Sequence, residues 1–126
     1  MSHSPGHQKW PDHKVEETHP GQHVEIYFGD KKIAETDDPI LLKEDGHPDR
    51  YYIPRSDVVM EALERTEETS ECPFKGIANY FSLKANGSKA DNAVWTYEEP
   101  YDEHQDIKDR VAFYTEKFDN IKVKIH

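Results

Sequence analysis

The sequence has little cysteine and no long apolar run, and these two scarcities exclude whole classes of protein. Its one cysteine, Cys72, cannot form an internal disulfide framework. No stretch approaches the roughly 20 apolar residues of a membrane-spanning helix, and no signal-peptide core follows Met1. We therefore expect a soluble, cytoplasmic protein that has no membrane partner.

Positive charge is also scarce, because 16 Lys and Arg residues stand against 26 Asp and Glu residues, for a formal net charge of −10 at pH 7. Binding a nucleic-acid backbone requires clustered basic residues that release counterions. The basic residues of this chain are scattered, so we expect no nucleic-acid partner. The composition still allows a local cationic pocket for one small anion.

Aromatic side chains are abundant, with seven Tyr, five Phe and two Trp in 126 residues. Each of them buries a large apolar area, so together they can fill a core although the hydrophobic content is only 34%. Residues 1–18 differ from the rest, since they contain histidines and prolines but few aliphatic residues. We predict a flexible His/Pro-rich arm over residues 1–18 and a single β domain over residues 19–126.

Short segments of alternating apolar and polar residues predict a mainly β fold. Gly29-Asp30 and Asn86-Gly87 are turn signals that join neighbouring segments into hairpins. Ser56 is suited to begin one short helix that runs to Leu63. The expected strands cover residues 23–28, 32–36, 40–42, 51–53, 69–72, 77–83, 93–97, 111–114 and 121–125, and residues 103–108 are a further helical candidate. We predict a single compact domain of antiparallel sheets, whose strand edges also suit a homodimer.

The segment Cys72-Pro73-Phe74-Lys75-Gly76 places the only thiol beside a turn and a cation. A thiolate is the reactive form of cysteine, and nearby cations favour it. The candidate residues of an electropositive, aromatic-lined pocket around Cys72 are Tyr52, Arg55, Lys75, Tyr80, Trp95 and Tyr97. In the alternative interpretation, Cys72 is a small buried hydrophobic residue and Lys75 is solvated.

Two of these positions have alternatives of their own. Arg55 carries a planar donor fork that suits an anion, although an ion pair with Asp57 or Glu61 is the alternative. Trp95 suits either a ligand platform or core packing.

Paired carboxylates in so acidic a chain are usually solvated, so we expect no metal ion at Glu98-Glu99 and no cofactor.

Several blocks of residues occur in one characteristic order and spacing, namely His19-Pro20, Tyr51–Val58, Thr69, Cys72–Gly76, Tyr80-Phe81, Asn92–Tyr101 and Val111–Tyr114. Through these blocks the chain closely resembles the family known as domain of unknown function four-two-seven, which some catalogues label nucleotidyltransferase-like. The resemblance covers nearly everything beyond the arm. It implies a compact β domain similar to the tent-like Mss4-type fold, without an established reaction.

The resemblance raises two possible activities, structural zinc binding and nucleotidyl transfer, and the residues of this chain can be checked for each. Many tent-like proteins hold a structural zinc ion through two Cys-x-x-Cys pairs, and a chain with only Cys72 cannot build that site. Nucleotidyl transfer commonly needs a Gly-Ser turn followed by two nearby carboxylates on a strand. Gly87-Ser88 is followed only by Asp91, so these residues make nucleotidyl transfer a poor candidate.

Two functions fit these residues. The first, which we favour, is a small-molecule binding domain in which Arg55 and Lys75 hold an anionic or polar ligand within an aromatic-lined pocket. The alternative is a small enzyme that uses Cys72 as nucleophile or redox thiol, with Lys75 and Arg55 favouring its thiolate. A third function, that of an interaction module, would follow if the fold encloses no pocket.

Overall fold

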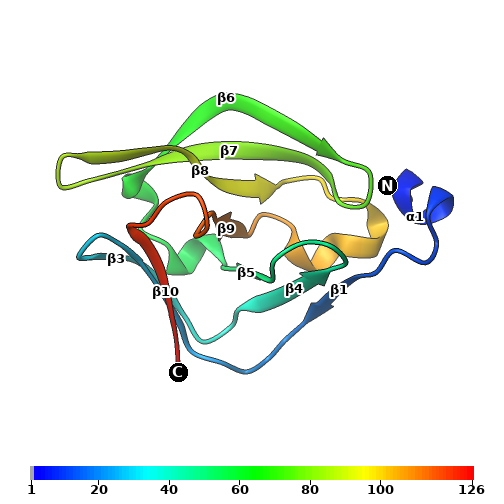
Figure 1. The fold of residues 1–126 in the computed structure, drawn as a ribbon, viewed down its shortest axis with the longest axis horizontal. Helices are drawn as coiled ribbons and strands as arrows, with labels where there is room; N and C mark the ends of the chain where they lie inside the picture. Colours follow the sequence, from blue (N-terminus) through cyan, green and yellow to red (C-terminus); the bar gives the residue numbers. More distant parts are fainter. Residues whose placement is uncertain (1) are drawn as a thin grey trace.

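The computed structural model describes residues 2–126, and the strands of these residues form three antiparallel sheets (Figure 1). The largest sheet has the order β6-β7-β8-β9, with bounds Leu63–Cys72, Gly76–Ala85, Ser88–Tyr97 and Val111–Phe113. The second has the order β10-β2-β3, with bounds Ile121–Ile125, Val24–Phe28 and Lys31–Thr36. The third has the order β1-β4-β5, with bounds Val15–Thr18, Ile40–Glu44 and Arg50–Tyr52. The predicted mainly β class is confirmed.

The helices are short. One α-helix, α1, covers Pro5–Lys9, and three 3₁₀ helices cover Arg55–Asp57 (η1), Met60–Ala62 (η2) and Asp102–Ile107 (η3). Within residues 2–126, no helix has the length and apolar character needed to cross a lipid bilayer.

A long hairpin joins β7 to β8 through Asn86-Gly87, as the sequence predicted. The pair Ala85 and Ser88 closes the turn, and Asn86 and Gly87 both have positive φ, at 52° and 80°. Positive φ at both central residues is the geometry of a type I′ turn, whose twist matches that of the flanking strands. This turn sets the pairing register between β7 and β8, and so determines which β8 side chains lie on each face of the sheet.

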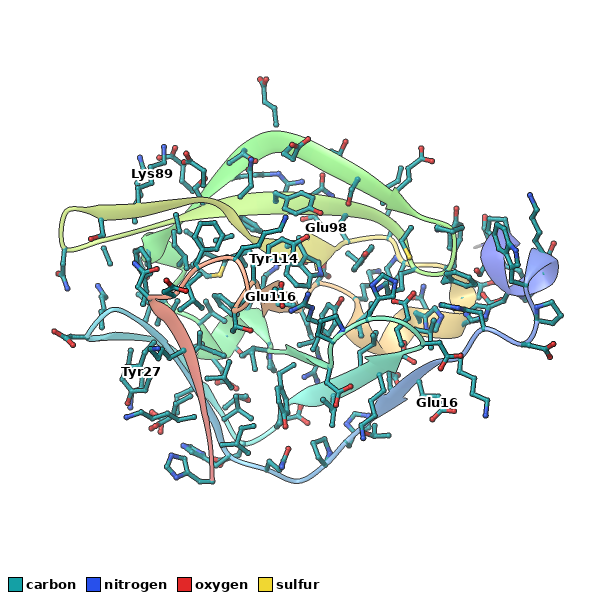
Figure 2. The ribbon with its side chains drawn as sticks, in the orientation of Figure 1. Glu16, Tyr27, Lys89, Glu98, Tyr114 and Glu116 are labelled. Atoms are coloured by element: carbon teal, nitrogen blue, oxygen red, sulfur yellow. The ribbon has the colours of Figure 1, made fainter. Side chains whose placement is uncertain are left out.

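The two smaller sheets pack against one side of the large sheet, at different ends, and side chains fill the space between them (Figures 1 and 2). The core therefore has two parts. The first lies under β10-β2-β3 and contains Val24, Ile26, Phe28, Ile53, Leu83, Val94 and Phe113. The second lies under β1-β4-β5 and contains Ile40, Leu42, Tyr52, Phe74, Trp95, Tyr97 and Ile107. Aromatic residues dominate this second part, as expected for a small domain with few aliphatic residues.

The helix predicted from Ser56 to Leu63 is wrong in its detail. The segment forms two separate 3₁₀ turns, η1 and η2, with extended backbone at Val58 between them. Val58 bridges to Ala34, and the Val59 N–H donates to the carbonyl of Ile33 at 2.8 Å. Tertiary pairing with β3 thus replaces the hydrogen bonds of a continuous helix.

The N-terminal segment, predicted as a flexible arm over residues 1–18, has regular structure in its described part. Ser4 caps α1 by accepting from the His7 N–H, and β1 pairs with β4 along its whole length. The Pro73 carbonyl accepts hydrogen bonds from the Gly6 N–H and the Ser4 Oγ, each at 2.7 Å. His7 Nε2 lies 2.8 Å from His104 Nε2. The segment thus contacts residues that are distant in sequence, and no local pattern indicates these contacts.

Gly6 provides a test of this docking, because an added Cβ would lie 2.6 Å from the Pro73 carbonyl oxygen. We expect Gly6→Ala to displace α1 and to raise the hydrogen-exchange rates of residues 4–10 by about ten-fold or more, since overpacking costs about 1–3 kcal/mol. The matched control is Gln8→Ala, at an exposed position on the same helix. Unchanged exchange in Gly6→Ala would show that α1 does not depend on this close approach.

Candidate functional site

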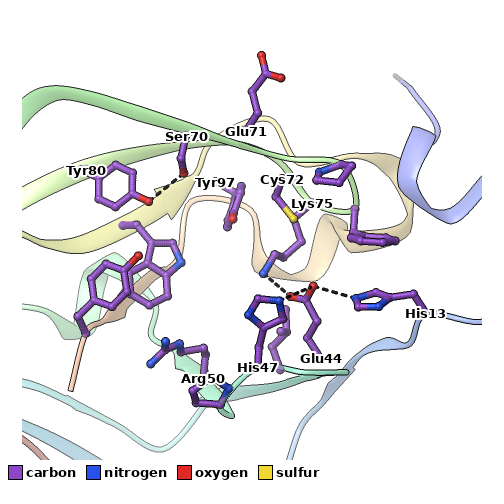
Figure 3. Close-up of a pocket in the computed structure, with 16 residues that line it drawn as sticks. His13, Glu44, His47, Arg50, Ser70, Glu71, Cys72, Lys75, Tyr80 and Tyr97 are labelled. Atoms are coloured by element: carbon purple, nitrogen blue, oxygen red, sulfur yellow. Dashed lines mark hydrogen bonds and ion pairs between the residues drawn. The ribbon is translucent and has the colours of Figure 1, made fainter. Parts of the chain in front are cut away.

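A cleft of about 340 Å³ lies where the turn between β6 and β7 faces the loop that follows β4 (Figure 3). The turn contributes Lys75, and Cys72 precedes it as the last residue of β6. The loop contributes His47, and Arg50 follows as the first residue of β5. Side chains from β7, β8 and the segment after β9 complete the wall, namely Tyr80, Trp95, Tyr97 and Tyr114. Of the cavities described in residues 2–126, this one contains the sequence-predicted cysteine.

The floor of the cleft is a buried ion pair between Lys75 and Glu44. The Lys75 Nζ donates to Glu44 Oε1 at 2.9 Å, and the two side chains are only 11% and 6% exposed. Removing two charges from water costs several kcal/mol for each ion unless they pair with good geometry. Glu44 therefore has to end β4 where it meets the turn that carries Lys75, and the ion pair ties these two segments together.

Both members of this pair are charged near neutral pH. Burial by itself lowers the pKa of Lys75, but the neighbouring Tyr52, Cys72 and Glu44 together raise this pKa above its ordinary value. Burial likewise raises the pKa of Glu44, while Lys75 and His13 lower it more strongly, so the net shift is downward. The cleft floor is therefore a fixed ammonium beside a fixed carboxylate.

Two histidines approach the other oxygen of Glu44. His13 Nε2 lies 3.0 Å from Glu44 Oε2, and the His13 ring stacks on Phe74 at a centroid distance of 4.2 Å. His47 Nε2 lies 3.7 Å from the same oxygen, with its side chain 62% exposed at the mouth of the cleft. Sequence reasoning assigned His13 to the arm and His47 to a loop, so it missed both. The only local signal was that His47 follows Glu44 by three residues.

An aromatic wall faces the ion pair. The Trp95 Nε1–H donates to the Tyr52 hydroxyl at 3.1 Å, and the Tyr114 ring lies 4.4 Å from the Trp95 ring. The Arg50 guanidinium stacks over Trp95 at 5.1 Å and binds both carboxylate oxygens of Glu116. Burial and the neighbouring Tyr80 hydroxyl raise the pKa of Tyr114 to about 12, so the Tyr114 phenol is neutral near pH 7.

The structure brings most of the predicted site residues together. Cys72, Lys75, Tyr80, Trp95 and Tyr97 line one cleft, with Cys72 half-buried. Tyr52 is fully buried behind the aromatic wall and does not line the cleft itself. It contacts the wall by accepting a hydrogen bond from Trp95.

Arg55 does not join them. Its guanidinium donates to Thr96 Oγ1 at 3.0 Å and to Glu98 Oε2 at 3.2 Å. Successive β8 side chains point to opposite faces of the sheet, so Thr96 and Glu98 face away from the cleft that Trp95 and Tyr97 line. Arg65, and then Arg55, lower the pKa of Glu98 to about 2. The cation that the cleft has instead is Arg50.

Breaking the buried ion pair should be costly and pH-dependent. Lys75→Met leaves the Glu44 carboxylate buried without its cation, so we expect the free energy of unfolding at pH 7 to fall by about 3 kcal/mol. Because the folded-state pKa of Glu44 is lowered, its stabilising effect is present above the unfolded value of 4.5 and is lost as the pH falls below it. The difference between the two proteins in urea denaturation should therefore shrink in acid.

The control is the double variant Glu44→Gln/Lys75→Met, which removes both charges and should recover most of the lost stability at pH 7. A Lys75→Met protein as stable as the wild type would show that the pair is effectively solvated.

The comparisons with known proteins agree with the sequence motifs. No curated protein matches the chain. Residues 15–124 match the family model described as Domain of unknown function (DUF427), whose short label refers to nucleotidyl transfer. The match begins with the first residue of β1 and ends within β10, so it includes both faces of the cleft. The predicted family is confirmed, and the chain belongs to the domain of unknown function family DUF427.

Proposed function

We propose that the cleft binds a small molecule that carries an anionic group, and that Lys75 holds this group. The observation that supports the proposal is the position of the Lys75 ammonium, which is buried yet lines an open cleft. An ammonium has three N–H donors, and within residues 2–126 the Lys75 ammonium donates a hydrogen bond to Glu44 alone. Donors therefore remain available for an anion that enters the cleft.

The size and lining of the cleft indicate what kind of molecule fits. A volume of about 340 Å³ lies at the small end of ligand pockets, so the ligand is of metabolite size. Tyr80, Trp95 and Tyr114 offer flat apolar surfaces, which favour a planar or aromatic portion. Arg50 closes the wall as a stacked cation, in the role that the sequence suggested for Arg55.

Anion binding can be tested with simple probes, because Glu44 competes internally for Lys75. We expect Glu44→Gln to bind inorganic phosphate and acetate about ten-fold more tightly than the wild type, equivalent to about 1.4 kcal/mol. Glu44→Gln/Lys75→Met should lose this binding, since the background is the same and only the ammonium is removed. Benzoate should bind more tightly than acetate if the aromatic wall contributes. NMR titration of the amide signals near Cys72 and Glu44 provides the affinities.

Arg55→Gln is the matched control, because it removes a cation from the opposite face of β8 and should leave the affinities unchanged. Equal phosphate affinities in Glu44→Gln and Glu44→Gln/Lys75→Met would contradict the assignment of Lys75 as the anion-binding group.

A second candidate function, an enzyme that uses Cys72, is favoured by one observation. The half-buried Cys72 lines the same cleft as the Lys75 ammonium, and a nearby cation favours the reactive thiolate. His13 also lines this cleft, as a potential proton acceptor. Nucleotidyl transfer has less support, because Gly87 and Ser88 form the tip of the β7–β8 hairpin and Asp91 pairs with Lys89 beside it.

The reactivity of Cys72 distinguishes the two candidates. In an enzyme of this kind, iodoacetamide should alkylate Cys72 faster in the native wild type than in the unfolded protein. The rate should fall when Lys75 is removed in Glu44→Gln/Lys75→Met. Mass spectrometry of quenched samples measures both rates. If Cys72 is labelled only after unfolding, the enzyme candidate fails. The binding function is judged separately: it stands if Glu44→Gln and Cys72→Ser both bind phosphate.

A further inference from the structure

Polar side chains form a grid on the outer face of the β10-β2-β3 sheet, away from the cleft. The pairing register aligns Lys124, Glu25 and Glu35 across the three strands. Two residues along the strands, His126 and His23 exchange two backbone hydrogen bonds. The intervening residues of β2, Val24 and Ile26, are buried, so strand alternation turns the grid residues outward.

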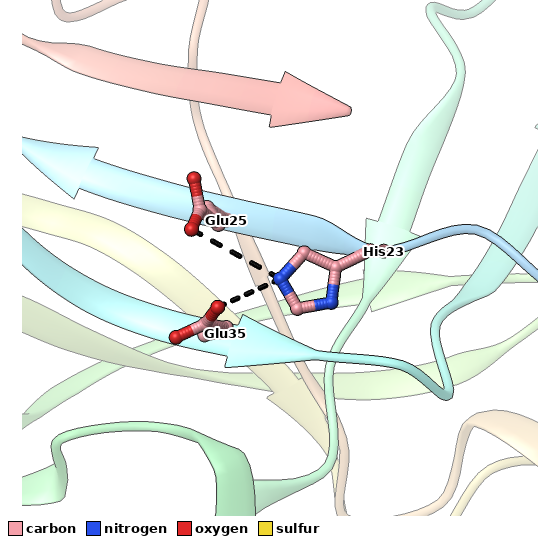
Figure 4. Close-up of side chains that lie close together, drawn as sticks. All are labelled: His23, Glu25 and Glu35. Carbon is pink, nitrogen blue, oxygen red and sulfur yellow. Dashed lines mark hydrogen bonds and ion pairs between the residues drawn. The ribbon is translucent and has the colours of Figure 1, made fainter. Parts of the chain in front are cut away.

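The potential ligand atoms in this grid lie close together (Figure 4). His23 Nε2 is 2.7 Å from Glu35 Oε2 and 4.0 Å from Glu25 Oε2. One ligand atom from each of these three residues lies within 4.8 Å of the other two. His126 Nε2 is 3.2 Å from Glu25 Oε1, which brings a second imidazole to the same carboxylate. Ligand atoms held at about 2.0–2.2 Å around one tetrahedral ion lie about 3.3–3.6 Å apart. The His23–Glu35 contact would therefore open, and the His23–Glu25 distance would close, each by less than about 1 Å. His126 lies outside this group of three and would turn toward the ion as a fourth ligand.

Two independent features point to a cation. His23 Nδ1 lies 2.5 Å from Asp37 Oδ1, a contact that orients the ring so that Nε2 faces the two glutamates. A carboxylate on the far nitrogen is the usual support of a metal-binding histidine. Glu25 and Glu35 are direct cross-strand partners, and like charges in that position repel each other. Lys32 offsets part of this repulsion, and a divalent ion between the two carboxylates would offset more of it.

Lys32 already supplies one positive charge to this cluster. Its Nζ is 2.6 Å from Glu35 Oε1 and 3.6 Å from Glu25 Oε2. The Lys32 side chain is 42% exposed, so the ammonium can move into solvent when another cation takes its place. Lys32 is therefore a competitor for the site, and its removal gives a direct way to test the site.

We propose that His23, Glu25, Glu35 and His126 bind a divalent transition-metal ion, and that Zn²⁺ is the ion their chemistry suits best. Two imidazole nitrogens and two carboxylate oxygens are ligands that zinc accepts in tetrahedral sites. The ion would link β10, β2 and β3 and so stabilise the sheet at the end of β10. This site lies on a different sheet from the cleft and is independent of the ligand proposed there.

The test is calorimetric titration of Zn²⁺ into the EDTA-treated full chain near neutral pH, with amide NMR signals followed in parallel. We expect one ion to bind per chain and to perturb signals of β10, β2 and β3. His23→Gln should weaken binding by about 10–100-fold. Lys32→Met should strengthen it by several-fold, because the competing ammonium is gone. A metal-dependent rise in melting temperature in the wild type, absent from His23→Gln, would support the same conclusion.

His19→Gln is the matched control, because His19 is also exposed and lies 3.9 Å from each of two carboxylates, Asp38 and Asp106. It should leave the affinity unchanged. The proposal is overturned if no Zn²⁺ binds, if His23→Gln binds as well as the wild type, or if the perturbed signals belong to the N-terminal histidines. The His23 variant keeps the buried face of β2 intact, so its circular dichroism spectrum should match that of the wild type.

Discussion

Burying the Lys75 ammonium obliges the protein to bring a carboxylate to it, and this requirement organises the cleft. Glu44 ends β4 within 2.9 Å of Nζ, which fixes the turn of Cys72 against the sheet β1-β4-β5. The same carboxylate draws His13 and His47 to the mouth. An ion pair of this kind adds little net stability compared with an apolar pair, but it strongly penalises any arrangement that separates the two charges. The geometry of the site follows from that penalty.

The alternation of strand side chains separates the remaining polar groups into different sites. On β8, Trp95 and Tyr97 face the cleft, whereas Thr96 and Glu98 face Arg55 on the other side. On β2, the buried Val24 and Ile26 alternate with outward residues that include Glu25 of the histidine and glutamate cluster. The alternation of side chains along each strand therefore keeps the cleft that contains Lys75 apart from the histidine and glutamate cluster on another sheet. A net charge of −10 is compatible with both, because each site depends on its local charges.

Much of the fold follows from local patterns. The alternating segments, Asn86-Gly87 and Gly29-Asp30 correctly predicted the β class and two hairpins, since turn chemistry and side-chain period act over a few residues. The helix from Ser56 failed because pairing of Val58 with Ala34 outweighs a weak local propensity. The contacts of the N-terminal segment have no sequence signal, because its partners, Pro73 and His104, lie far along the chain.

The sequence by itself determined the family, the β class and some of the residues that line the cleft of Cys72, because motifs and short periods are local properties of the chain. Only the tertiary structure decided which charges meet. Arg55 and Arg50 are both near the aromatic strand in sequence, yet the side of the sheet on which each side chain emerges puts only Arg50 at the cleft. The partnership of Lys75 with Glu44 likewise depends on strand order across the two sheets, which no spacing in the sequence encodes.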